Sequence, residues 1–252
     1  MSLGRFEDRV VLVTGAASGI GRATAERIGA EGGRVLCVDL QAEAAADTAD
    51  TIARAGGTAE ARTCDVSDPG QVADTVAACV DGFGRLDVLC NVAGILPPMQ
   101  ETTELELATW QRALDVNLTG TFLMCQAALP QLLESGGNIV NTSSTSALRG
   151  LPWSAAYAAS KGGVLALTYT LAVEYGKQGV RANAVCPGNI MTPMTSAVRL
   201  PEGVDTQLIV RTVALDRPRG PEVVAGVIAM LASEDGAHVN GELIRMDGGA
   251  LS

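Results

Sequence analysis

The chain has 252 residues; 47% are hydrophobic but only 3% are aromatic, so its core must be built from Ala, Val, Leu and Ile. The formal net charge of −10 argues against nucleic acid or an anionic membrane as a partner, because both require a basic face. No uninterrupted apolar stretch approaches the about 20 residues of a membrane span, and the N-terminus lacks the pattern of a signal peptide. We therefore expect a cytoplasmic protein.

The cysteines also favour a reducing compartment. No C-x-x-C occurs, and His238 is the only histidine that could join a zinc site, so we expect no metal. Reduced, buried thiols are expected at Cys37, Cys64, Cys79, Cys90, Cys125 and Cys186.

Short β-branched runs alternate with longer Ala-rich segments, and several of the runs are apolar throughout, as strands covered on both faces should be. The runs predict strands at Val10–Val13, Arg34–Val38, Thr58–Thr63, Val88–Asn91, Ile139–Asn141, Ala182–Val185 and Leu243–Met246. The longer segments predict helices at Ile20–Glu31, Ala42–Ala55, Gln71–Phe83, Leu105–Leu133, Ala155–Tyr175 and Glu222–Ala232. This alternation predicts an α/β fold: a Rossmann-like, doubly wound parallel sheet of about seven strands with helices on both faces.

No linker or repeat interrupts the alternation, so residues 1–252 are expected to form a single domain. The one long irregular segment, residues 189–220, mixes helical and loop signals. A connection of that length in a compact domain is usually functional, and we expect a substrate lid.

A glycine-rich segment, TGAASGIG at residues 14–21, joins the first predicted strand to the first helix. Glycines allow a tight turn and the close approach of a pyrophosphate, which N–H groups at a helix start can bind. The spacing is not G-x-G-x-x-G, so a merely structural turn is the alternative. Asp39, at the end of the second strand, favours binding, because an acidic residue there can accept hydrogen bonds from the adenosine ribose. A solvated carboxylate, or the cap of the helix at Gln41, is the other interpretation of Asp39.

Tyr157 and Lys161 are separated by four positions and lie on one face of a predicted helix. A Y-x-x-x-K pair alone is usually just an exposed pair. This one follows the polar strand end NTSS at residues 141–144, so a serine could lie opposite the phenol. A phenol with a pKa near 10 becomes a usable base only when cations stabilise the phenolate, and Lys161 and an oxidised nicotinamide ring would supply them.

Together these motifs resemble the short-chain dehydrogenase/reductase family. The resemblance rests on TGAASGIG, Asp39, Asp65-Val66, Asn91-Val92-Ala93-Gly94, Asn117, Ser144, Tyr157-x-x-x-Lys161, Pro187-Gly188 and Met246-Asp247-Gly248-Gly249. It covers essentially the whole chain, and the order and spacing match throughout. One departure is Val92, where the family commonly has a second asparagine, and this puts the local hydrogen bonding in doubt.

The resemblance implies the catalytic roles. Tyr157 is the general base in alcohol oxidation and the general acid in reduction, and Ser144 holds the substrate oxygen. Lys161 lowers the pKa of the phenol and binds the nicotinamide ribose. Asn117 holds a water that links Lys161 to solvent; a buried asparagine bonded to backbone where a helix distorts is the structural alternative, and both can be true.

The resemblance also implies where the cofactor binds. The contacts expected are Gly15, Ser18, Gly19, Ile20, Gly21, Asp39, Asp65, Val66, Asn91, Ala93, Gly94, Tyr157, Lys161, Pro187, Gly188, Ile190 and Thr192. Asp65 would accept from the adenine amine. Asp39 predicts NAD rather than NADP, because a 2′-phosphate would face a carboxylate, and Ser18 and Leu40 stand where NADP-using relatives often carry a basic residue.

The prediction is therefore an NAD-dependent oxidoreductase that transfers a hydride between the cofactor and a secondary alcohol or ketone. An NADPH-dependent 3-ketoacyl reductase is the first alternative, disfavoured by Asp39. A non-catalytic NAD-sensing regulator is the second, disfavoured by the complete Ser-Tyr-Lys set.

The substrate is a small molecule whose pocket is expected to be mostly apolar, which suggests a hydrophobic alcohol, although the same residues would also serve to close the lid or pack between subunits. They are Leu96, Pro97, Met99, Ser146, Leu148, Trp153, Met191, Met194, Val198 and Leu200. Arg149 and Arg199 could bind an acidic substrate, but surface arginines usually bind nothing. The helices at Leu105–Leu133 and Ala155–Tyr175 are apolar on more than one side, and related proteins pair them across a two-fold axis, so we expect a homotetramer.

Overall fold

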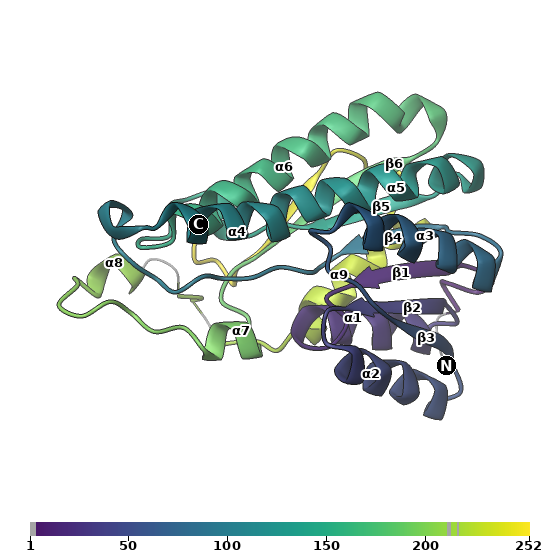
Figure 1. Cartoon of the computed structure of the whole chain (residues 1–252), viewed down its shortest axis with the longest axis horizontal. Helices are drawn as coiled ribbons and strands as arrows, with labels where there is room; N and C mark the ends of the chain where they lie inside the picture. The colour runs from purple at the N-terminus through teal and green to yellow at the C-terminus, as the bar shows by residue number, and fades with distance from the viewer. Residues whose placement is uncertain (1–3, 211–212, 216) are drawn as a thin grey trace.

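The computed structural model of the chain describes residues 4–210, 213–215 and 217–252. Parallel strands form one sheet in the order β3-β2-β1-β4-β5-β6-β7 (Figure 1). Their bounds are β1 Val10–Thr14, β2 Arg34–Asp39, β3 Thr58–Thr63, β4 Val88–Asn91, β5 Asn138–Thr142, β6 Arg181–Pro187 and β7 Leu243–Met246. The order reverses between β1 and β4, which confirms the doubly wound sheet and creates a switch point at its centre.

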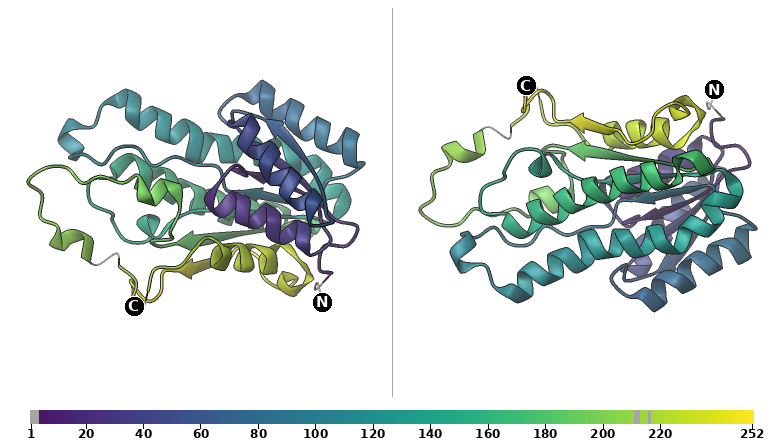
Figure 2. Two further views of the ribbon diagram at one scale, coloured as in Figure 1. Left: turned by 90° about the horizontal axis from the view of Figure 1, so that it is seen from below. Right: turned by 90° about the horizontal axis from the view of Figure 1, so that it is seen from above.

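Helices cover both faces of the sheet, as predicted (Figures 1 and 2). One face carries α1 (Gly19–Ala30), α2 (Ala42–Arg54) and α9 (Glu222–Ala232), and the other carries α3 (Pro69–Phe83), α4 (Leu107–Leu114), α5 (Gly120–Ser135) and α6 (Ala155–Tyr175). Strand side chains alternate between the two layers. In β1, Val10 and Leu12 belong to one buried cluster and Val11 and Val13 to the other. Among the described residues, no helix is long and apolar enough to span a membrane.

Helix α3 shows how local sequence sets these boundaries. The Asp68 carboxylate accepts hydrogen bonds from the backbone N–H groups of Gly70 and Gln71, and Pro69 occupies the first turn. Gly84 ends the helix with φ +83°, a left-handed conformation that glycine adopts without strain. The helix therefore starts and stops where its own residues satisfy the free backbone groups.

The helix predicted over Leu105–Leu133 is present from Leu107, but it is not a regular α-helix throughout. Between α4 and α5, the segment Asp115–Thr119 forms a π-helical turn. The wider turn changes the direction in which Asn117 points, and the Thr121 hydroxyl donates to the Asn117 carbonyl at 2.8 Å. A single π turn inside a longer helix often marks a functional position.

The segment at residues 189–220 projects beyond the carboxyl edge of the sheet (Figures 1 and 2). It contains α7 (Pro193–Ser196) and α8 (Gln207–Val210), and a parallel bridge between Ile190 and Arg219 joins its two ends. Residues 211, 212 and 216 of the predicted lid lie outside the described residues. This mixture of helix and loop agrees with the mixed signals that the sequence shows in the segment. That the segment acts as a substrate lid stays a prediction.

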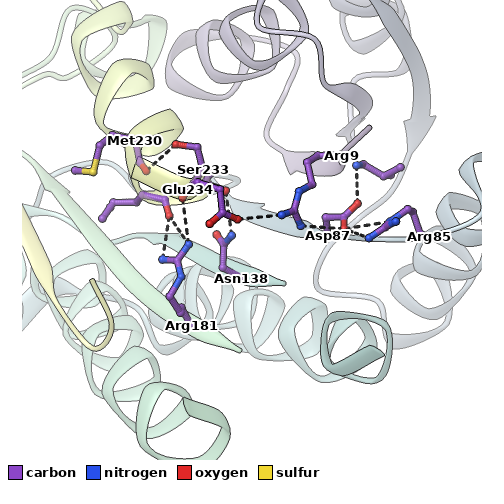
Figure 3. Close-up of polar contacts among 11 residues, drawn as sticks. Arg9, Arg85, Asp87, Asn138, Arg181, Met230, Ser233 and Glu234 are labelled. Atoms are coloured by element: carbon purple, nitrogen blue, oxygen red, sulfur yellow. Dashed lines mark hydrogen bonds and ion pairs between the residues drawn. The ribbon is translucent and has the colours of Figure 1, made fainter. Parts of the chain in front are cut away.

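The opposite edge, where the strands begin, is closed by ion pairs (Figure 3). Asp87 is fully buried, and its carboxylate accepts from the Val10 N–H at 2.9 Å. It pairs with Arg85 at 2.6 Å and with Arg9 at 3.4 Å, and Arg9 also reaches Glu234 at 3.0 Å. These contacts join the starts of β1 and β4 to the segment after α9.

Carbonyl groups at the C-terminal end of α9 are capped at the same edge (Figure 3). Arg181 donates to the Leu231 carbonyl at 3.1 Å, and Asn138 donates to the Ala232 carbonyl at 3.0 Å. A cation is favourable at a helix C-terminus, where carbonyl groups lack intrahelical partners. The amino edge thus leaves few polar groups for a ligand.

Candidate active site

A cavity of about 310 Å³ runs along the carboxyl edge of the sheet. It lies over the switch point between β1 and β4, where open α/β sheets bind their ligands. Every predicted site residue except Asn91 and Asn117 lines it. The structure therefore brings together residues from the first strand to the segment after β6.

The glycine-rich loop between β1 and α1 forms the floor of this cavity. Gly15 has φ +71° and Gly19 φ +52°, both in the left-handed region. A Cβ added to Gly21 would lie 2.0 Å from the Gly15 carbonyl oxygen, so only glycine allows this approach. The Ser18 side chain makes no cap hydrogen bond and the first turn of α1 holds no acidic residue, which leaves this end suited to a pyrophosphate.

Asp39 holds the same loop from the end of β2. Its Oδ2 accepts from the Ala17 N–H and its Oδ1 from the Gln41 N–H, both at 3.0 Å. Each oxygen keeps a second lone pair, and Asp39 lines the cavity. Asp39 thus holds the turn that precedes α2 but does not cap this helix, whose N-cap is Gln41 and has no side-chain cap, and the binding of a ribose by Asp39 stays a prediction.

Asp65 and Arg112 form the far end of the cavity. Asp65 Oδ1 accepts from the Ser67 N–H at 2.9 Å and from the Ser67 hydroxyl at 2.6 Å, while Arg112 reaches Oδ2 at 3.4 Å. The hydrogen bonds from Ser67 lower the pKa of Asp65 against the effect of burial, with a smaller contribution from Arg112. Sequence reasoning missed Arg112, because nothing local places a residue of α4 beside the loop after β3.

Asn91 does not reach the cavity. Its side-chain amide is buried and donates to Asn141 Oδ1 at 2.9 Å and to Cys125 Sγ at 3.3 Å. At the departure Val92, the backbone is held because the Thr14 hydroxyl accepts from the N–H groups of Val92 and Ala93, while the neighbouring Asn91 Oδ1 is buried without a partner among the described residues. The turn after β4 is thus held by β1.

Ser144, Tyr157 and Lys161 lie together at the other end of the cavity. The Ser144 hydroxyl accepts from the Ser146 N–H at 3.2 Å, which orients it. Lys161 donates to the Thr142 carbonyl at 2.8 Å, and its Nζ lies 5.9 Å from the centre of the Tyr157 ring. A hydroxyl, a phenol and an ammonium on rigid elements can bind a substrate oxygen and move its proton.

Burial dominates the ionisation of this set. It raises the pKa of Tyr157, and the adjacent Ser144 hydroxyl opposes this only in part. Burial also lowers the pKa of Lys161 to about 8. The ammonium therefore does not by itself give the phenol the lowered pKa that the family resemblance implies, and a further positive charge is needed to form the phenolate.

Asn117 supports the catalytic end without facing the cavity. Its Oδ1 accepts from the Ile95 N–H at 2.7 Å, and its Nδ2 donates to the Ile95 carbonyl at 2.9 Å and to Ser160 Oγ at 3.0 Å. A Cβ on Gly94 would lie 3.0 Å from Asn117 Oδ1 and 3.3 Å from Lys161 Nζ. The structural interpretation of Asn117 is confirmed, and its part in a proton relay stays a prediction.

A second cavity of about 520 Å³ opens beside Ser144 and Tyr157. Five of the predicted pocket residues line it: Leu96, Met99, Ser146, Met194 and Val198. Pro97 and Trp153 line a small neighbouring hollow instead, while Leu148, Met191 and Leu200 are exposed. Sequence reasoning missed contributions from distant segments, namely Leu151, Pro152, Leu208, Ile209 and Leu251.

Known proteins resemble this chain over nearly its full length. A family profile described as Enoyl-(Acyl carrier protein) reductase matches residues 15–250. The chain is 37% identical over 265 residues to the 3beta-hydroxysteroid dehydrogenase of Mediterraneibacter gnavus, covering 98% of this chain and 96% of that protein. It is 40% identical over 249 residues to the meso-2,3-butanediol dehydrogenase of Serratia marcescens, with coverage of 98% and 96%. The crystal structure of levodione reductase matches with a TM-score of 0.91 at 36% identity, covering 98% of this chain and 100% of that one.

The fold, the cavity and these relatives define the class of protein, an oxidoreductase that acts on a CH–OH group or its ketone with a nicotinamide cofactor. The chain belongs to the short-chain dehydrogenase/reductase family.

Proposed function

We propose that this enzyme oxidises an apolar secondary alcohol with NAD as the hydride acceptor. The proposed preference for NAD over NADP rests on Asp39. Its carboxylate lines the cavity, backbone N–H groups fix both of its oxygens, and the neighbouring cavity residues Leu40 and Gln41 are uncharged. A 2′-phosphate placed there would meet a fixed negative charge with no compensating cation.

The residues of the chain account for the proton chemistry. Ser144, Tyr157 and Lys161 would hold the substrate beside an oxidised nicotinamide, which would supply the hydride acceptor and a positive charge near the phenol. Ser144, oriented by the Ser146 N–H, holds the substrate oxygen, and Tyr157 takes its proton. Lys161, fixed by the Thr142 carbonyl, supplies the second positive charge and binds the ribose. In the reverse direction, the reduction of a ketone, the neutral phenol donates its proton to the substrate oxygen. Burial raises the pKa of Tyr157 and so favours this neutral form.

The second cavity supports an apolar substrate. Leu96, Met99, Leu151, Met194 and Leu251 contribute to its walls, and no Asp or Glu occurs among its described lining residues. Relatives named for a hydroxysteroid and for a butanediol are consistent with a secondary carbinol of varied size. The structure of levodione reductase adds a relative named for a ketone.

The proposal extends to assembly and location. Phe122, Tyr169 and Val173 are exposed on α5 and α6, where apolar side chains favour a contact between subunits, and we propose a homotetramer. A stable monomer at micromolar concentration, measured by light scattering, would contradict the proposed homotetramer. The six buried, free cysteines support a cytoplasmic location.

A panel of secondary alcohols and ketones tests the proposal, with nicotinamide absorbance at 340 nm followed using NAD and NADP. We expect kcat/KM to favour NAD by at least about 10²-fold, because unit charges 4 Å apart at a dielectric near 20 repel by about 4 kcal/mol before solvent screening. Asp39→Asn removes the charge but keeps a hydrogen-bond acceptor, and should bring the kcat/KM values for NAD and NADP closer together. Leu40→Arg, at a side chain that is 58% exposed, should narrow the difference further by giving the phosphate a partner.

Equal use of both cofactors by the wild type, or an unchanged ratio in Asp39→Asn, would contradict the role of Asp39. Failure of every alcohol and ketone in the panel would contradict the proposed reaction.

A further inference from the structure

The second cavity has a charge pattern unlike that of the protein as a whole. The chain carries a formal net charge of −10, yet the described residues that line this cavity include one cation, Arg149, and no carboxylate. An anion that the rest of the surface repels would therefore find its counter-charge here.

Arg149 has no partner within the described chain. Its guanidinium makes no hydrogen bond or ion pair there, whereas Arg5, Arg9 and Arg85 all pair with carboxylates. Arg199, the other arginine that the sequence suggested for an acidic substrate, already donates to the carbonyls of Ser196 and Val198. Among the described residues that line this cavity, Arg149 is therefore an exposed arginine that is free to bind a ligand.

The backbone at Arg149 is tied to the catalytic turn. Its N–H donates to the Thr145 carbonyl at 3.0 Å, and Thr145 opens the 3₁₀ turn Thr145–Ala147 directly after Ser144. The turn thus fixes the backbone of Arg149 close to Ser144, and the reach of its exposed side chain limits how far the guanidinium can lie from the reacting oxygen. A substrate that reaches both must have a spacer of defined length.

We propose that Arg149 binds an oxyanion on the substrate, so that the enzyme prefers a secondary alcohol joined through an apolar spacer to a carboxylate, sulfonate or phosphate. A guanidinium binds such groups with two parallel, charge-assisted hydrogen bonds. The apolar walls then contact the spacer, while Ser144 and Tyr157 hold the carbinol at the other end. This inference rests on the proposed function and revises its substrate: the alcohol keeps an apolar part against the cavity walls but ends in an oxyanion at Arg149.

Hydroxy acids of increasing length test it. The series 3-hydroxybutanoate, 4-hydroxypentanoate, 5-hydroxyhexanoate and 6-hydroxyheptanoate is compared with the corresponding methyl esters at saturating NAD. At one spacer length we expect kcat/KM for the acid to exceed that for its ester by about tenfold, the value of one charge-assisted contact open to solvent on one side. The sulfonate and the phosphate ester of that length then show which oxyanion fits best.

Variants separate Arg149 from the general surface charge. Arg149→Gln should reduce the acid-to-ester ratio to about one, and Arg149→Lys should keep part of it because the charge remains but the planar fork is lost. Arg199→Gln is the matched control and should leave the ratio as in the wild type. The preference should also shrink as ionic strength rises, since salt screens an exposed pair.

The result that overturns the inference is turnover of the esters with no preference for the acid at any length, or a preference that Arg149→Gln retains. Binding of unreactive hexanoate to the protein with saturating NADH, followed by calorimetry, is independent of turnover. Weaker binding of hexanoate to Arg149→Gln than to the wild type supports the inference even if the proposed reaction fails, and equal binding overturns it.

Discussion

The two edges of the sheet differ in how their buried charged groups are paired, although the amino edge also holds one buried polar atom, Asn138 Oδ1, without a partner among the described residues. At the amino edge, Asp87 has three partners, and Arg181 donates to carbonyls at the end of α9 (Figure 3). At the carboxyl edge, Lys161 is buried with one carbonyl as its acceptor, and the Thr142 hydroxyl has no partner among the described residues. Paired charges stabilise a fold, whereas unpaired buried groups cost stability and remain available to a ligand.

This difference suggests that the amino edge of the sheet serves mainly stability and the carboxyl edge mainly catalysis. Substitutions at the carboxyl edge should change activity and leave the fold intact or more stable. Substitutions at the amino edge should lower stability and leave the chemistry intact. The following predictions test that assignment of roles.

Tyr157→Phe should have the largest effect. In the proposed mechanism the phenol takes the substrate proton, so its loss should lower kcat by about 10²–10⁴-fold or more. The ring still fills the same volume, so the midpoint of thermal unfolding should stay close to that of the wild type. NADH fluorescence should show that the variant still binds the cofactor.

A Tyr157→Phe variant that kept near wild-type turnover on a good substrate would contradict the mechanism. A variant that lost NADH binding along with activity would instead make the phenol a cofactor ligand.

At the amino edge, Asp87→Ala should destabilise the protein strongly. It leaves the buried Val10 N–H without its acceptor and separates Arg9 and Arg85 from their shared partner, although both arginines are partly exposed and regain water. We expect the free energy of unfolding to fall by about 2–4 kcal/mol, measured by urea denaturation. Asp87→Asn, which keeps an acceptor for Val10, should lose less.

Below the unfolding transition, the Asp87 variants should retain kcat within about twofold, since the site lies at the other edge of the sheet. A large loss of kcat without loss of stability would show that the two edges are coupled.

The same contrast explains how much the sequence could predict. The sequence placed β3, β4 and β7 at their observed bounds. The fully buried β4 is marked by its apolar run, whereas β3 and β7 are edge strands with partly exposed residues and are marked by their position in the alternation of strands and helices. The motif residues Gly15, Asp39 and Tyr157 were located because their chemistry depends on short spacings within or between adjacent elements. Local information was sufficient for this part of the site.

What the sequence could not predict depends on contacts between distant segments. The π turn at Asn117 is stabilised by hydrogen bonds to Ile95 and Ser160, and helix periodicity contains no sign of them. Arg112 and Leu251 line the two cavities because the fold brings distant segments together, and neither residue belongs to a recognisable motif. The position of the Asn91 side chain outside the cavity has the same kind of cause, because its partner Asn141 lies on the neighbouring strand.

Lys161→Met should lower the rate of oxidation yet stabilise the protein. Burial lowers the pKa of Lys161 to about 8 from 10.5, so at pH 7 the folded state holds an ammonium that it disfavours by about 3 kcal/mol. Loss of the hydrogen bond to the Thr142 carbonyl offsets part of the gain, and we expect a net increase of about 1–3 kcal/mol in the free energy of unfolding.

The pH dependence gives the sign of the Lys161 effect. Between pH 8 and about 10.5 the unfolded wild type binds more protons at this position than the folded state, so wild-type stability rises with pH there. The advantage of Lys161→Met should therefore be full below pH 8 and shrink as the pH rises. A destabilised Met variant, or an advantage that does not change with pH, would mean that the ammonium is better compensated than burial implies.

Arg112→Gln should have the smallest effect. The guanidinium is half exposed and pairs with Asp65 at 3.4 Å, and exposed pairs of this kind contribute little. Its loss nevertheless frees the carboxylate that faces the adenine end, and the pKa of Asp65 should rise slightly as the contribution of Arg112 disappears. We expect the KM for NAD to increase by about three- to fivefold, with a smaller change in kcat. Arg112→Lys is the matched control: a KM near that of the wild type would show that charge alone is required, and a KM like that of the Gln variant would show that the planar fork positions Asp65 and Ser67 together. If neither variant changes the KM, Arg112 is a surface ion pair that plays no part in cofactor binding.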